Sequence, residues 1–304
     1  MDYKKIIRSR RLRIKIMQFL SFFPDSLMIK AQYRVKTGRK LNLNNPQRYT
    51  EKLQWYKIHY KNPTMKQCVD KHEVREYVRQ KGLASILNET YGVYESFEEI
   101  DFSRLPDKIV IKDTLGGGSV SVIVFDQKKD DYIQLKEMCD RWVSEPMKSK
   151  HPGREWPYDE TKHRIVIERY LEQQNGDLAD YKFYCFNGKV ACFYIRTDYL
   201  KMHDNAKMAF FDREGQLLEG VGMDYCAPSK EAPAIPDNLG QMIKYAELLS
   251  REFPHVRVDF YNVDGEIFFG ELTFYNASGY MAFIPDSFDF DLGSIFELEE
   301  FAYE

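Results

Sequence analysis

The sequence predicts an α+β fold in which β-hairpins alternate with helices, so that the sheets are antiparallel or mixed. Two stretches carry most of this prediction. Residues 257–273 hold two segments rich in β-branched and aromatic residues around Val263-Asp264-Gly265, and an Asp-Gly pair in that setting is a strong hairpin signal. Residues 109–124 hold two more apolar segments on either side of a glycine run, which predicts a second hairpin.

The remaining elements follow from local patterns in chain order. Residues 1–80 are predicted to be mostly helical, with one helix starting near Thr50 and another running from about Glu73 to a stop at Gly82. The later expectations are a hairpin at 108–125, a helix at 130–145, an exposed loop at 145–158, a strand at 164–171, a hairpin at 181–198 that turns at Asn187-Gly188, a proline-rich loop at 227–236 and a helix at 239–252. We therefore divide the chain into a helical N-terminal region (1–80), a lobe with the glycine run (81–172) and a C-terminal lobe (173–304).

Composition limits the class of protein. A chain of 304 residues with 43% hydrophobic and 30% charged residues can bury one large core or two smaller ones. The net charge of −3 gives no support to nucleic-acid binding. Five scattered cysteines without a C-x-x-C pair indicate reduced thiols and not a disulfide framework or a zinc site. The sequence contains no run of about 18 apolar residues, so we predict no transmembrane helix and expect a cytoplasmic protein.

The N-terminus combines seven basic residues between Lys4 and Lys15 with the apolar stretch Ile16–Phe23. Two interpretations remain open. The segment forms a basic amphipathic helix that docks on the anionic inner face of a membrane, or it packs on the protein body with its basic face in solvent. The packed helix is favoured. The segment superficially resembles a signal peptide, but its apolar stretch is short and Pro24-Asp25-Ser26 offers no small-residue cleavage site.

The C-terminal hairpin carries the clearest chemical signal. Side chains alternate between the two faces of a strand, so Arg257 and Asp259 point to one side, and so do Glu271 and Thr273. A cation and two carboxylates on a half-buried face are costly unless something compensates their charge. Mg²⁺ with a bound polyphosphate would do so, because Mg²⁺ prefers a few carboxylates together with phosphate oxygens. The alternative is a solvated hairpin with an ordinary salt bridge.

The glycine run supplies an independent phosphate signal. An apolar strand ends near Lys112 and is followed by Gly116-Gly117-Gly118-Ser119. Glycines let backbone N–H groups approach an anion, and a lysine supplies a mobile positive charge for phosphate. The pattern is neither G-x-G-x-x-G nor a Walker loop. Its alternative interpretation is a flexible hairpin tip.

These segments together resemble the ATP-grasp superfamily, and within it the TupA-like (teichuronopeptide-biosynthesis-like) branch. The likeness covers most of the chain, and the order and spacing of its segments make it fairly specific. The segments that carry it are 40–46, 51–55, 69–78, Leu105-Pro106, Asp180-Tyr181-Lys182-Phe183, Asp259-Phe260-Tyr261 and 270–274.

The resemblance implies a nucleotide held between two α+β lobes. It implies that Lys71 and Lys112 reach the phosphates, that Asp259 and Glu271 hold Mg²⁺, and that Arg257 faces the reacting acyl phosphate, with Lys112 also catalytic. The other implied nucleotide contacts are the loop residues Gly116, Gly117, Gly118 and Ser119, the adenine-binding hinge residues Glu168, Tyr170 and Leu171, and Asp180 at the ribose with Lys182 beside it.

Two positions depart from the family pattern. Thr273 stands where such ligases usually have an asparagine that completes the metal shell, which puts a second metal in doubt and leaves the threonine hydroxyl as a weaker candidate ligand. Asn276 is nearby but out of register for that role. The loop from Asp113 to Gly118 also differs, which puts its individual contacts in doubt but not its position.

The implied activity is an ATP-dependent carboxylate–amine ligation through an acyl phosphate. The TupA-like branch suggests an amide on a polysaccharide precursor of the cell envelope or capsule, from a uronic acid and an amino acid or amine, or the reverse pairing. The alternatives are a kinase on the same fold, a non-catalytic scaffold, and a glycosyltransferase-like enzyme. Asp289-Phe290-Asp291 would favour the last, but this D-x-D string is typical of a turn or a solvated face.

Aromatic and histidine side chains supply weaker candidates. Tyr194, Tyr199, Tyr225, Phe274 and Tyr275 could stack on a sugar, although most are expected in the core. The six histidines show no metal-ligand spacing, and His203 and His255 are either bases or structural.

Overall fold

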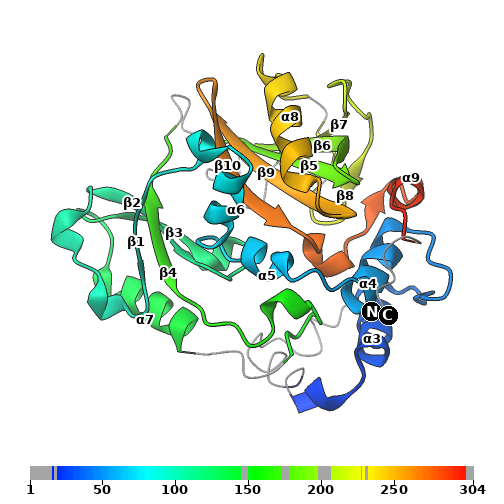
Figure 1. Ribbon diagram of the computed structural model, residues 1–304, viewed down its shortest axis with the longest axis horizontal. Helices are drawn as coiled ribbons and strands as arrows, with labels where there is room; N and C mark the ends of the chain where they lie inside the picture. Colours follow the sequence, from blue (N-terminus) through cyan, green and yellow to red (C-terminus); the bar gives the residue numbers. More distant parts are fainter. Residues whose placement is uncertain are drawn as a thin grey trace.

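The computed structural model describes residue 16 and residues 19–144, 150–172, 178–197, 207–226, 228–229 and 232–298. Three antiparallel sheets are present in this part of the chain, with strand orders β1-β4-β2-β3, β10-β9-β5-β6-β7 and β11-β8. In the view of Figure 1 the four-stranded sheet lies on the left, the five-stranded sheet lies at the upper right, and α5 and α6 lie between them. The predicted α+β class is confirmed.

The N-terminal region is helical where it is described. It contains η1 (Leu20–Phe22), α3 (Asp25–Thr37), α4 (Tyr49–His59), α5 (Thr64–Val69) and α6 (Val74–Gln80), and η2 (Ala84–Ile86) follows it. The two helices predicted to start near Thr50 and Glu73 are both present. Gly82 has φ of +75°, a conformation that favours glycine and ends the second of them, as predicted.

The four-stranded sheet consists of β1 (Thr90–Tyr94), β2 (Lys108–Asp113), β3 (Val122–Asp126) and β4 (Ile165–Arg169), and α7 (Tyr132–Val143) packs against it. Ile109, Ile111, Ile165 and Ile167 are fully buried and share a core with Leu135 and Cys139 of α7. Since side chains alternate along a strand, Lys112 and Glu168 lie on the opposite face of this sheet. The predicted hairpin at 108–125 and helix at 130–145 are thereby confirmed.

The five-stranded sheet consists of β5 (Asp180–Phe186), β6 (Lys189–Thr197), β7 (Lys207–Asp212), β9 (His255–Val263) and β10 (Glu266–Thr273). Helix α8 (Leu239–Ser250) covers its apolar face, where Phe183, Phe193, Val258 and Phe260 are fully buried. Both predicted hairpin turns are present. Asn187-Gly188 and Asp264-Gly265 have positive φ at both central residues, which is the geometry of type I′ turns.

Shorter elements complete the described chain. They are η3 (Phe97–Glu99), η4 (Phe102–Arg104), η5 (Ser119–Ser121), η6 (Trp156–Tyr158), β8 (Gly222–Met223), η8 (Asn276–Gly279), β11 (Phe283–Ile284) and α9 (Ser287–Ile295). All five cysteines are buried thiols that form no disulfide. Within the described residues, no helix is both long and apolar enough to cross a bilayer.

The prediction of an exposed loop at 145–158 holds for Lys150, which is exposed, but it is wrong for residues 151–158. None of residues 151–158 is exposed. The Arg154 guanidinium lies 3.1 Å from Asp25 and donates to the carbonyl groups of Leu20 and Ser21. The indole of Trp156 donates to the carbonyl of Tyr60 at 3.0 Å. Polar residues thus bind this segment to the N-terminal helices, so that its polar composition does not place it in solvent.

The D-x-D string does not form a turn, and it is only partly solvated, since Phe290 and Asp291 are exposed. It lies in α9, and Asp289 is fully buried. The Asp289 carboxylate accepts from the backbone N of Thr50 at 2.9 Å and from its hydroxyl at 2.7 Å. The carboxylate therefore satisfies a free N–H group at the start of α4.

The two sheets are linked through the N-terminal helical region. The backbone N of Lys71, directly after α5, donates to the carbonyl of Thr114 at 2.8 Å, and α5 also packs against β10. The guanidinium of Arg169, at the end of β4, lies 5.4 Å from the ring centre of Phe268 in β10. The division of the chain at residues 80 and 172 remains a proposal.

Candidate active site

Arg257 lies at the centre of a polar network on the face of the five-stranded sheet that is opposite α8. Its Nε and Nη2 donate to the two carboxylate oxygens of Asp259, each at 2.7 Å. Nη2 also donates to Glu271 at 3.1 Å and to the hydroxyl of Thr273 at 3.0 Å. Cross-strand pairing explains this arrangement, because Glu271 lies opposite Asp259 and Thr273 lies opposite Arg257. Each pair points to one side of its strand, as the alternation predicts, and a β-bulge between Phe269 and Glu271 brings the two pairs together on one face.

Lys182 joins the same network from β5. Its Nζ lies 2.6 Å from Asp259 Oδ2 and 3.3 Å from Asp180 Oδ2. Lys182 and Asp259 are direct cross-strand partners. The sequence placed Lys182 beside the ribose contact but did not connect it with Asp259, because the pairing of β5 with β9 joins segments 77 residues apart.

Burial and the positive charges oppose each other in this network, and at Asp259 burial outweighs the charges of Arg257 and Lys182 and raises the pKa. Although burial raises the pKa of Glu271, the charges of Arg257, Lys182 and Lys71 outweigh it and lower that pKa to about 2. Burial lowers the pKa of Lys182, but the carboxylates of Asp180 and Asp259 raise it overall. Glu271 and Lys182 are therefore both charged at neutral pH.

Thr273 and Asn276 have different roles in the network. The Thr273 hydroxyl donates to Glu271 Oε1 at 2.9 Å and so lies beside a candidate metal ligand. Asn276 accepts from Arg257 Nη1 and donates to the hydroxyl of Tyr184 at 2.6 Å. The amide thus fixes the arginine, which sequence reasoning missed when it considered Asn276 only as a metal ligand.

Lys71 connects this network with the glycine loop. Its Nζ donates to the carbonyl of Asp113 at 2.9 Å and to that of Gly116. Burial lowers the pKa of Lys71, and the charge of Glu271 opposes this shift. The charge of Lys112 acts on the same ammonium group. Glu271 and Lys112 are therefore both close enough to Lys71 for their charges to affect its ammonium group.

The glycine loop differs in packing from one glycine to the next. A Cβ on Gly116 would collide with Ser121 and lie 2.6 Å from Asp113 Oδ2, whereas Gly117 and Gly118 have open space around them. Gly118 has φ of +74°. The side chain of Ser119 lies outside the described residues. Close packing thus requires a glycine at position 116 only, and the positive φ favours a glycine at position 118.

The predicted hinge residues lie at the end of β4 and directly after it. Lys112 Nζ forms an ion pair with Glu168 at 2.6 Å, and both side chains are mostly buried. The ring of Tyr170 lies 3.8 Å below the ammonium of Lys108, and Leu171 is 9% exposed. A phosphate approaching Lys112 would therefore compete with the Glu168 carboxylate.

Two tyrosines near the network were not predicted. Tyr261 lies opposite Asp180, and the charge of that carboxylate together with burial raises its pKa. Burial and the charges of Glu155 and Glu271 raise the pKa of Tyr158, which places η6 close to the site. Tyr261 could have been found from its alternation with Asp259, but nothing local in the sequence indicates Tyr158.

The weaker candidates are mostly structural. Tyr194, Phe274 and Tyr275 are buried in the core, Tyr225 is 49% exposed, and Tyr199 and His203 lie outside the described residues. His255 is fully buried and hydrogen-bonds to Tyr49 and to the carbonyl of Cys185. Burial lowers its pKa to about 3, so it remains neutral and structural.

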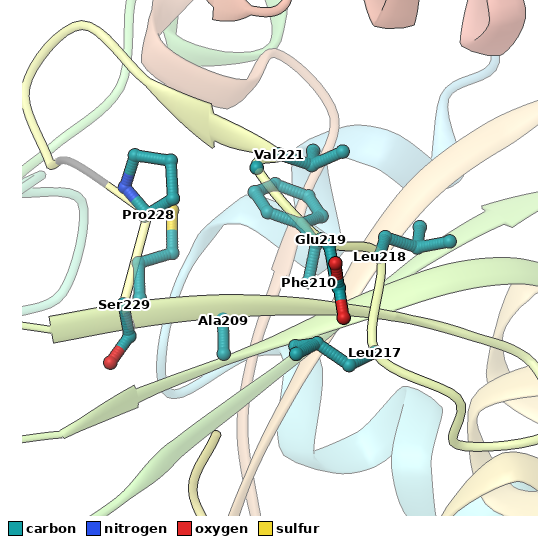
Figure 2. Close-up of a pocket in the computed structure, with 10 residues that line it drawn as sticks. Ala209, Phe210, Leu217, Leu218, Glu219, Val221, Pro228 and Ser229 are labelled. Atoms are coloured by element: carbon teal, nitrogen blue, oxygen red, sulfur yellow. The ribbon is translucent and has the colours of Figure 1, made fainter. Parts of the chain in front are cut away.

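A cavity of about 390 Å³ lies elsewhere, at the outer edge of β7. Figure 2 shows Leu217, Leu218 and Val221 on one side of it and Pro228 and Ser229 on the other. The backbone N of Leu218 and that of Ser229 donate to carbonyls of β7, each at 2.8 Å, so the cavity is a gap between two segments that cover this edge strand. None of its lining residues belongs to the polar network.

The donor set of the network fits a magnesium ion that is only partly held by protein. No group of three or more His, Cys, Asp or Glu side chains suited to a metal occurs among the residues that can be described. Asp259 and Glu271 provide two carboxylates, and the Glu271 side chain is 44% exposed. Mg²⁺ typically uses one or two carboxylates and takes its other ligands from phosphates and water.

The chain belongs to the TupA-like ATP-grasp family, whose model matches residues 51–297. No curated protein matches it significantly. Among solved structures, a D-alanine–D-alanine ligase from Bacillus anthracis is 18% identical with a TM-score of 0.43, covering 74% of this chain and 63% of that one. An L-amino acid ligase from Bacillus licheniformis is 16% identical with a TM-score of 0.39, covering 71% of this chain and 43% of that one. A D-alanine–D-alanine ligase from Helicobacter pylori is 14% identical with a TM-score of 0.44, covering 82% and 68%. The chain thus spans less than two thirds of the first two of these proteins.

Proposed function

We propose that the protein is an ATP- and Mg²⁺-dependent carboxylate–amine ligase that works through an acyl phosphate. The observation that carries this proposal is the network in which Arg257 contacts Asp259, Glu271 and Thr273, with Lys182 on the same sheet face. Membership of the TupA-like ATP-grasp family supports it, and so does the similarity to ligases of amino acids.

The proposed roles follow from where charge must be neutralised. A substrate carboxylate that attacks the γ-phosphate of ATP is repelled by the triphosphate, so positive groups must hold the two together. Arg257 is buried and rigid, which suits it to stabilise the transferring phosphoryl group. Asp259 and Glu271, with the Thr273 hydroxyl beside them, would hold Mg²⁺, which would neutralise phosphate oxygens.

The nucleotide is proposed to lie between the two lobes. Lys71 and Lys112 would contact its phosphates, and the loop of Gly116, Gly117, Gly118 and Ser119 would cover them. Glu168, Tyr170 and Leu171 would contact adenine, with Asp180 at the ribose and Lys182 near the metal carboxylates. The ion pair of Lys112 with Glu168 supports this arrangement. The Lys112 ammonium group is mostly buried and already held by an anionic oxygen, and a phosphate oxygen could take the place of that carboxylate.

The finer proposal concerns the substrates. We propose a cytoplasmic enzyme that joins a uronic acid and an amino acid or amine on a polysaccharide precursor of the cell envelope. The TupA-like family assignment supports this class of substrate. The exposed ring of Tyr225 is the aromatic side chain best placed to stack on a sugar, because Tyr194, Phe274 and Tyr275 are buried.

The test is a screen for ADP release with ATP, Mg²⁺ and pairs of uronic and amino acids. The expected result is an amide, with ADP and free phosphate released in equal amounts. With the carboxylate alone, hydroxylamine should trap the acyl phosphate as a hydroxamate. A stable phosphoester without free phosphate would identify a kinase instead. Binding of a sugar nucleotide without binding of ATP would identify a glycosyltransferase-like enzyme.

A further inference from the structure

The chain is strongly polarised in charge. Residues 1–40 contain twelve lysines and arginines but only Asp2 and Asp25 as acids, a net charge of +10. Because the whole chain carries −3, residues 41–304 carry −13. Such an asymmetry indicates a partner that is itself anionic and meets the protein at its N-terminal end.

The described part of this end presents one cationic and apolar face. On α3, Leu27, Lys30, Ala31, Arg34 and Val35 are all exposed. Their spacing of three and four residues places them on one side of the helix. The opposite side, with Met28, Ile29, Gln32 and Tyr33, is buried against the protein.

Two phenylalanines that precede the helix are also exposed. Phe19 is 78% exposed and Phe22 is 70% exposed, two of the three largest exposed fractions among the large hydrophobic residues of the described chain. In Figure 1 the dark-blue start of the described chain lies at the lower end of the view, away from both sheets. Exposed aromatic rings next to cations are typical of proteins that lie on a lipid surface.

The surrounding contacts keep this face positive and hold it in place. Asp25 is its one described acid, and it is neutralised by Lys150 at 2.9 Å and by Arg154 at 3.1 Å. Arg154 also donates to the carbonyls of Leu20 and Ser21, so the turn between the two phenylalanines is anchored to the protein body.

We propose that the face formed by Phe19, Phe22, Leu27, Lys30 and Arg34 docks on an anionic phospholipid surface. The cations would attract the lipid headgroups, and the aromatic rings would enter the boundary between headgroups and acyl chains. A nucleic acid would also attract the cations, but it would leave the two phenylalanines without an apolar environment. The inference does not depend on the proposed ligase reaction.

The experiment measures binding of the full chain to vesicles by flotation. Vesicles of phosphatidylcholine with about a third phosphatidylglycerol are compared with pure phosphatidylcholine, at low and at high salt, because salt screens exposed charges. We expect binding only to the anionic vesicles, and loss of that binding at high salt.

Matched variants locate the binding face. Each basic residue near such a surface contributes about fivefold in affinity, so Lys30→Gln with Arg34→Gln should weaken binding about 25-fold. Lys244→Gln with Arg251→Gln removes the same charge from exposed residues on and next to α8 and should leave binding nearly unchanged. Phe19→Ser with Phe22→Ser should weaken binding at least about tenfold, whereas Ile133→Ser, at a residue that is 72% exposed on α7, should not.

Three results would overturn the proposal. One is no binding to the anionic vesicles at low salt. Another is equal weakening by the α8 charge variant and the α3 charge variant, which would mean that binding is non-specific. The third is binding of RNA or DNA that displaces the vesicles and is unaffected by the phenylalanine variant. Unchanged thermal unfolding and unchanged ADP release by the variants separate these outcomes from misfolding and from failure of the ligase proposal.

Discussion

Arg257→Met is the most informative substitution at the candidate site. It removes five hydrogen bonds that the guanidinium makes to Asp259, Glu271, Thr273 and Asn276. Removing one partner of a buried ion pair typically costs about 3–5 kcal/mol. We expect the lower end, about 3 kcal/mol, because Lys182 still pairs with Asp259 and water reaches the Glu271 side chain, which is 44% exposed.

Arg257→Met should lower the rate of ADP release by more than the loss of folded protein would explain. Deleting one preorganised donor to a transferring group typically costs about 10²–10³ in rate, and we expect that loss in ADP release at saturating ATP. Arg257→Lys should recover part of the stability but little of the rate, since a lysine cannot form the two parallel bonds to Asp259. Arg251→Met, at an exposed arginine, is the matched control and should change neither.

Magnesium provides a readout that separates the proposed site from a structural salt bridge. In Arg257→Met, Asp259 and Glu271 lose their shared cation, so their negative charge should attract Mg²⁺ to the free protein. We therefore expect millimolar Mg²⁺ to raise the unfolding temperature of this variant more than that of the wild type. The reasoning is refuted if the variant folds, shows no added response to Mg²⁺ and releases ADP at the wild-type rate.

Four further substitutions test other parts of the molecule. Asp259→Asn should abolish ADP release, and an unchanged rate would contradict its assignment as a metal ligand. Gly116→Ala should raise the KM for ATP, because its Cβ would collide with Ser121, whereas Gly117→Ala has open space and should not. Asp289→Ala should lower the free energy of unfolding by about 1–2 kcal/mol in urea titrations, because it removes the cap of α4, and an unchanged midpoint would exclude that role. Lys57→Met should remove a pH dependence of stability, measured by urea unfolding at pH 7 and 9.

The sequence predicted the elements whose signals are local. Asp264-Gly265 and Asn187-Gly188 determine their turns through residues that tolerate positive φ, so both hairpins were predictable. Their full register was not, because it shifts between Phe269 and Glu271 in one hairpin and between Tyr184 and Cys185 in the other. Alternation along each strand then put Arg257 with Asp259 and Glu271 with Thr273, but only the β-bulge between Phe269 and Glu271 brings the two pairs to the same face.

The contacts that the sequence did not predict join distant segments. Lys182 reaches Asp259 because β5 pairs with β9, and Asp289 accepts a hydrogen bond from Thr50 in the first turn of α4, 239 residues earlier. Residues 151–158 have the composition of an exposed loop but are held by polar contacts with the N-terminal helices. Composition reports how polar a segment is, and it does not report whether a partner elsewhere in the chain satisfies those polar groups.

Lys57 carries the last prediction, and the sign of its pH effect follows from its burial. The side chain is fully buried in α4, and its Nζ donates to the carbonyl of Ser278 at 2.7 Å and to that of Gly153 at 3.1 Å. Burial lowers its pKa from 10.5 to about 7, although the nearby charge of Glu155 opposes this shift. Between pH 7 and 10.5 the unfolded chain therefore binds more protons than the folded one, so stability rises with pH.

The size of this effect can be worked out from the two pKa values. With about 7 in the folded state and about 10.4 in the unfolded state, the rise between pH 7 and pH 9 is about 2 kcal/mol. Comparing the wild type with Lys57→Met at each pH cancels the titration of all other groups. The wild type should therefore gain about 2 kcal/mol on the variant between the two pH values. A difference between the two proteins that stays constant from pH 7 to pH 9 would show that Lys57 does not titrate in this range.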